Sequence, residues 1–145
     1  MATVTKRVLT GSTANANNYA SAAFTPTAGE LLVVISHATG SIDATPACVA
    51  SANGITFTRV ARLEHTLSGN VSAIFVADQL VPGSPVSMTV TVQHAADAAT
   101  GCFVAVAGVS SISVSDFDMA HPVNDSLTLL NDVSNMTVNL QLGDN

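Results

Sequence analysis

The sequence predicts an all-β fold: an antiparallel two-sheet β-sandwich, jelly-roll-like, with little or no helix. The chain of 145 residues is rich in residues typical of strands and polar turns, with 19 Val, 16 Thr, 15 Ser and 10 Asn. It is poor in the residues that cover helix surfaces, with four Lys plus Arg and two Glu. Short apolar segments recur between turn residues, and no helical period persists.

Eleven segments have the composition and length of strands. They are 3–10, 20–25, 30–38, 47–52, 55–64, 71–79, 86–93, 102–109, 112–117, 127–130 and 136–142. Because the chain has the length of one domain and a single composition, we expect one sandwich domain over 1–145. Residues 110–132 are more acidic and less regular, which is consistent with a loop or arm that projects from the sandwich.

Segments 31–36, 71–77 and 102–109 are apolar at both odd and even positions. This pattern predicts central strands that are covered on both sides, so their residues should form the core or an interface. Segments 86–92 and 136–142 instead alternate between apolar and polar residues, which predicts strands with one wet face.

Turn residues separate these segments. Asn53-Gly54 predicts a hairpin with left-handed turn residues. The apolar residues Ile55 and Phe57 occupy odd positions, whereas Val60 occupies an even one. This change in the alternation predicts a β-bulge near Arg59. The Ala-rich segment 94–100 is short and ends at Gly101, so we expect a loop or a single turn there.

Charge is unevenly distributed along the chain. All four basic residues lie in the first 62 positions and eight of the ten acidic residues lie beyond, so the two parts carry +2 and −8. Without clustered cations, neither nucleic acid nor an anionic membrane is an expected partner. The longest aliphatic run, 31–35, is far too short for a membrane helix, and no export signal opens the chain.

No catalytic motif is present, so we expect neither an enzyme nor a cofactor. The nearest approach to a metal site is the group Asp116, Asp118, His121 and Asp125, which we interpret as a solvated acidic loop without metal. Glu64 beside His65 has the composition of an acid/base pair, but a surface ion pair with Arg62 is the simpler interpretation.

Cys48 and Cys102 both lie in apolar surroundings. Two cysteines are too few for a disulfide framework, so we expect buried free thiols. This use of cysteine fits folding in a cytoplasm.

Three segments carry a family resemblance: YASAAFTPTAGELLVVI at 19–35, NGITFTRVA at 53–61 and TGCFVAV at 100–106. Together they resemble the capsid decoration, or cement, proteins of tailed phages, in which an S-Y-x-x-x-x-F-T-P-x-A segment, a buried strand and a G-N-G-L-T-W hairpin recur. The resemblance covers residues 8–109. Phe57 stands where that family usually has Trp, and Ile55 replaces Leu.

The resemblance implies a structural virion protein, made in the host cytoplasm, that binds the outside of a phage head and stabilises the shell. Its partners would be the major capsid protein and further copies of itself, since such proteins commonly form homotrimers with head-to-tail contacts. Two unlike charged patches are candidate subunit or capsid contacts: Lys6, Arg7, Arg59 and Arg62, and Asp116 with Asp118.

Two alternatives belong to other classes. A carbohydrate-binding or tail-fibre-like adhesion module needs aromatic platforms, and the chain has no Trp and one Tyr. A small hydrolase on a jelly roll needs a catalytic group, and the sequence offers none.

Overall fold

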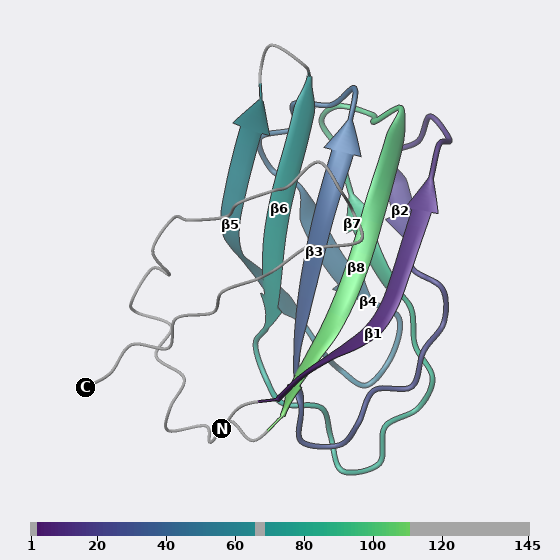
Figure 1. Ribbon diagram of the computed structural model, residues 1–145, viewed down its shortest axis with the longest axis vertical. Helices are drawn as coiled ribbons and strands as arrows, with labels where there is room; N and C mark the ends of the chain where they lie inside the picture. The colour runs from purple at the N-terminus through teal and green to yellow at the C-terminus, as the bar shows by residue number, and fades with distance from the viewer. Residues whose placement is uncertain (1–2, 66–68, 111–145) are drawn as a thin grey trace, which may run out of the picture. The chain divides into compact units, whose positions relative to one another are not determined.

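The computed structural model describes residues 3–65 and 69–110, which form two antiparallel sheets and no helix. The five-stranded sheet has the order β1 (Thr3–Ser12), β8 (Gly101–Ser110), β3 (Leu31–Thr39), β6 (Asn70–Ala77) and β5 (Phe57–His65). The three-stranded sheet has the order β2 (Asn18–Ala20), β7 (Val90–Gln93) and β4 (Ala47–Ala50). Figure 1 shows the larger sheet in front of the smaller one. The predicted all-β sandwich is confirmed.

The chain crosses between the sheets at every connection except the β5–β6 hairpin. A jelly roll pairs its eight strands as β1-β8-β3-β6 and β2-β7-β4-β5. This protein has both orders, with one change: β5 pairs with β6 at the edge of the larger sheet instead of with β4. An isolated bridge between Val49 and Thr56 is what joins β4 to the start of β5.

The three segments that are apolar at both odd and even positions form β3, β6 and β8, the interior strands of the larger sheet. The prediction of central strands is therefore confirmed. Their inward side chains meet those of the smaller sheet in a core that excludes water. Its largest fully buried apolar members include Leu32, Phe75, Met88, Val90, Val92 and Val106. Each contributes about 1.5–3 kcal/mol on burial.

Two predicted strands begin or end elsewhere. Segment 20–25 was expected to be a strand, but β2 spans Asn18–Ala20, because the Ser21 hydroxyl accepts the Val90 amide at 3.0 Å in place of a backbone carbonyl. Segment 86–93 was expected to be one strand, but β7 begins at Val90. Val86 is 57% exposed, since the Asn53 side chain binds both its amide and its carbonyl at 2.9 Å.

The predicted left-handed turn is present, with φ of 65° at Asn53 and 62° at Gly54. It does not close a regular hairpin, because the strand that follows it joins the other sheet. Segment 94–100 is a loop, as expected.

Register shifts interrupt two edge strands. In β5 the shift lies between Arg59 and Ala61, where the bulge was predicted, and in β1 it lies between Lys6 and Val8. Each bulge adds one residue, so side chains that would alternate come to lie on the same face.

The expected strands 112–117, 127–130 and 136–142 lie outside the described residues, as does all but the first residue of the expected loop 110–132. The expectation of one domain over 1–145 includes them and stays a prediction. No helix in the described part of the chain is long and apolar enough to cross a membrane.

Candidate interaction surface

Cross-strand register divides the side chains of the larger sheet between two faces. Val34 lies opposite Phe75 and Val106, and this set points toward the smaller sheet. Val33 lies opposite Val76 and Ala107, and this set points away from it. We call the second face the outer face.

The outer face is mostly apolar along its three central strands, with His37 and Ser72 as polar exceptions. Its large aliphatic side chains there are each at most 7% exposed: Leu31, Val33, Ile35, Ile74, Val76 and Val109. The small side chains of Ala105 and Ala107 between them are partly buried. The central strands are therefore mostly apolar on the side where an antiparallel sandwich ordinarily carries polar residues.

Large apolar side chains at the margins of the outer face are exposed. Val4 and Leu9 on β1 are 61% and 38% exposed, Leu63 on β5 is 51% exposed, and Phe103 on β8 is 40% exposed. The Phe103 ring lies over Gly11 of β1, where an added Cβ would meet a ring carbon at 2.7 Å. These four side chains are exposed apolar groups toward the two edges of the outer face, and the large apolar side chains between them are buried.

The smaller sheet presents a different surface. Tyr19, Val92 and Cys48 form one row across its three strands and point into the core. The alternate positions carry polar or small residues, with Val49 as a 45% exposed exception: Asn18, Ala20, Ala47, Thr91 and Gln93. The sandwich thus has one polar face and one apolar face.

Of the four basic residues proposed as contacts, Lys6 is exposed and lies in register with Ala107 of the outer face. Arg7, the extra residue of the β1 bulge, binds the Glu30 carboxylate, which is 1% exposed, and the Thr27 hydroxyl at 2.6 Å. Glu30 in turn accepts the Thr27 amide at 2.9 Å. Arg7 is therefore occupied within its own chain.

Arg59 and Arg62 also bind their own chain. Because of the bulge at Val60, both lie on the inward side of β5, in register with Phe75 and Ala73. Arg59 donates to the carbonyl of Ala44 at 2.9 Å, and Arg62 donates to those of Asp43 and Ile42 at 2.9 and 3.0 Å. The two guanidinium groups attach the edge of the larger sheet to the segment that leads into β4.

The acidic half of the proposed charge pairing, Asp116 and Asp118, lies outside the described residues, as do His121 and Asp125. Within residues 3–65 and 69–110, no group of three His, Cys, Asp or Glu side chains could hold a metal ion.

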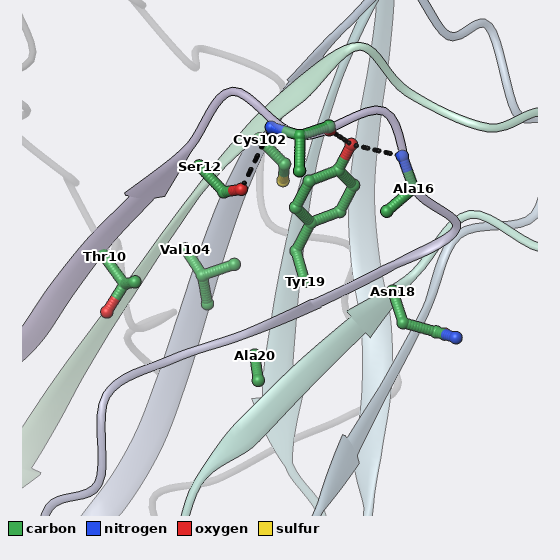
Figure 2. A pocket seen from close by; sticks show the side chains of 9 residues that line it. Thr10, Ser12, Ala16, Asn18, Tyr19, Ala20, Cys102 and Val104 are labelled. Carbon is green, nitrogen blue, oxygen red and sulfur yellow. Dashed lines mark hydrogen bonds between the residues drawn. The ribbon is translucent and has the colours of Figure 1, made fainter.

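A hollow of about 130 Å³ lies between β1 and β2, at one margin of the sandwich (Figure 2). The Tyr19 hydroxyl lies 2.7 Å from the carbonyl oxygen of Ala14 and 2.6 Å from that of Ala99. Burial raises the pKa of the Cys102 thiol to about 12, so this cysteine is not a nucleophile at neutral pH. The hollow holds no group suited to catalysis.

Glu64 and His37 have structural partners. Glu64 binds Arg62 at 2.6 Å, which confirms the predicted ion pair. His37 Nδ1 lies 2.8 Å from the Ser72 hydroxyl, and burial lowers its pKa. Cys48 and Cys102 are free and buried, as expected.

Sequence reasoning missed the exposed margins at Leu9 and Leu63, which belong to segments identified only as strands, whereas Phe103 belongs to segment 102–109, which was expected to be core or an interface. It also missed the pairing of Arg7 with Glu30, which are 23 residues apart. A search of protein-family models, of curated proteins and of solved structures finds no match for this chain. The apolar outer face is the feature with the clearest functional meaning.

Proposed function

We propose that this protein is a structural virion protein, a capsid decoration protein that binds the outside of a phage head and stabilises its shell. The family resemblance of residues 8–109 suggests this role. The observation that carries the proposal is the exposed apolar margin of the outer face, formed by Val4, Leu9, Leu63 and Phe103.

A decoration protein performs no chemistry, and it needs a rigid body with a surface that another chain can cover. Burial of apolar surface would supply most of the binding energy. Exposed ion pairs contribute only about 0–1 kcal/mol each. Three of the four basic residues bind groups of their own chain, which also favours apolar contacts over charge pairing.

The alternative, a carbohydrate-binding or tail-fibre-like module, receives less support. Sugar-binding sandwiches present flat aromatic side chains to their ligand. The single Tyr of the chain, Tyr19, is 4% exposed and its hydroxyl lies against backbone carbonyls.

The test is binding to purified phage heads that lack this protein, measured by co-sedimentation and by electron microscopy. We expect the wild-type chain to bind and to raise the temperature at which the heads rupture. Leu63→Asp should weaken binding at least tenfold. Val49→Asp is the matched control, because Val49 is similarly exposed but lies on the smaller sheet.

Two results would contradict the proposal: failure of the folded wild-type protein to bind any head, or equal loss of binding in both variants. Binding to a glycan array without binding to heads would favour the adhesion module instead.

A further inference from the structure

His94 follows β7 directly and is fully buried. Its backbone amide donates to the Asn17 carbonyl at 2.7 Å, and its carbonyl accepts the Asn17 side-chain amide at 2.7 Å. Its ring lies edge-on to Tyr19, with centroids 6.2 Å apart and an interplanar angle of 72°. Backbone and ring are therefore both held in place.

Neither ring nitrogen of His94 has a hydrogen-bond partner within the described part of the chain. A neutral imidazole carries one hydrogen-bond donor and one acceptor. Both would bind water in the unfolded chain, so leaving them unpaired in the core lowers the free energy of unfolding. The charged form is less favourable still, because burial lowers the pKa of His94. The negative charges of Asp43 and Asp97 oppose this effect but do not overcome it.

Those two carboxylates already have partners in the neutral protein. Asp43, 2% exposed, accepts the Thr45 amide at 2.8 Å and the Ala96 amide at 3.4 Å, and Asp97 accepts the Ile42 amide at 2.9 Å. The bonds to Ala96 and Ile42 hold segment 41–46 against segment 94–97, a contact that we call the seam. Because Arg59 and Arg62 bind the same segment 41–46, the seam also connects β4 to the edge of the larger sheet.

We propose that His94 is an acid-sensitive latch that keeps the seam closed while its ring is neutral. The neutral ring packs against Tyr19 and does not compete for the carboxylates of Asp43 and Asp97, which accept hydrogen bonds from backbone amides. A ring that takes up a proton from solvent has two N–H donors and a positive charge. It either draws Asp43 and Asp97 away from the amides of Ala96 and Ile42 or leaves the core, and both movements loosen the seam.

The direction of the pH effect follows from linkage. An unfolded chain protonates this histidine with its ordinary pKa of about 6.5, whereas the folded chain does so only at lower pH. Stability is therefore full above pH 6.5 and falls as the pH drops toward the folded pKa. Tyr19 on β2 packs against the ring, and the charged groups that act on it are Asp43 in segment 41–46 and Asp97 in segment 94–97.

The test compares the wild type with His94→Phe at pH 8 and pH 5.5, by urea unfolding and by hydrogen exchange. Phe keeps an aromatic ring against Tyr19 and needs no hydrogen bond. We expect acid to raise the unfolding equilibrium constant several-fold more in the wild type than in the variant. The amides of Ile42, Thr45 and Ala96 should lose protection at pH 5.5 in the wild type alone.

His37→Gln is the matched control, because burial also lowers the pKa of His37, which lies on β3 and binds Ser72. This variant should keep the acid response of the seam. Equal acid sensitivity in the wild type and His94→Phe would overturn the proposal.

If His94→Phe does not fold, the wild-type His94 ring can be titrated by NMR. A midpoint at or above 6.5, or a lower one without coincident change at the Ile42 and Thr45 amides, would overturn the proposal. A lower midpoint with that change would support it.

Discussion

At the scale of single residues, the most constrained group of the described chain is the Glu30 carboxylate. It is 1% exposed and binds Arg7, and it accepts the Thr27 amide. A buried carboxylate requires ion-pair or hydrogen-bond partners, and Glu30 has both kinds. Gly108 of β8 makes room for it, since a Cβ at that position would collide with the carboxylate. This explains a glycine in the middle of a central strand.

Gly108→Ala should therefore destabilise the protein by about 1–3 kcal/mol, because the added methyl must displace a carboxylate that is fixed on two sides. Urea unfolding followed by circular dichroism measures the change. The control is Gly83→Ala, where an added Cβ meets no atom within 4 Å and stability should stay within about 0.5 kcal/mol. Equal stability of both variants would show that the Glu30 site adapts at little cost.

At the scale of elements, β3, β6 and β8 could be predicted because their segments are apolar at both odd and even positions. A strand that is buried on both sides needs apolar residues at both. The bulge near Arg59 was likewise visible in the phase of Ile55, Phe57 and Val60. The sheet that β5 joins was not predictable, since Phe57 suits either partner and tertiary pairing decides. The partners of Arg59 and Arg62 depend on that pairing, so the sequence indicated two cations without showing that they bind segment 41–46.

Arg62→Lys should destabilise the protein by about 1–3 kcal/mol, although the charge is kept. The guanidinium binds the carbonyls of Asp43 and Ile42 together with Glu64, and an ammonium cannot reproduce that fork. Thermal unfolding in low and high salt measures the change, which should depend little on salt because two of the acceptors are carbonyls.

Lys6→Arg is the control for that variant, because Lys6 is exposed, and stability should not change. If Arg62→Lys were as stable as the wild type, the link between β5 and segment 41–46 would depend on charge alone.

At the scale of the whole molecule, the two outer surfaces differ in kind. The smaller sheet presents Asn18, Thr91 and Gln93, which water can solvate. The larger sheet carries exposed apolar side chains at its margins, whereas the large apolar side chains at the centre of its outer face are buried. A protein that functioned alone would gain nothing from this asymmetry, whereas a subunit of a shell needs one face for partners and one for solvent.

We expect this protein to be a homotrimer in solution, with a mass of about three times 14.7 kDa. A ring of three uses head-to-tail contacts between unlike patches, and a stable interface of this kind buries roughly 1,200–2,000 Å². The exposed apolar side chains Val4, Leu9, Leu63 and Phe103 would form part of that contact. Light scattering at micromolar concentration should report the trimer, and high salt should loosen it only in part, because few free charges contribute.

Leu63→Asp should shift the protein toward monomers, because it places a charge at a margin of the outer face, whereas Val49→Asp on the smaller sheet should leave the trimer intact. Circular dichroism of both variants verifies that each remains folded. A wild-type monomer at micromolar concentration would contradict this prediction. A trimer that survives Leu63→Asp would place the subunit contact away from the β5 margin.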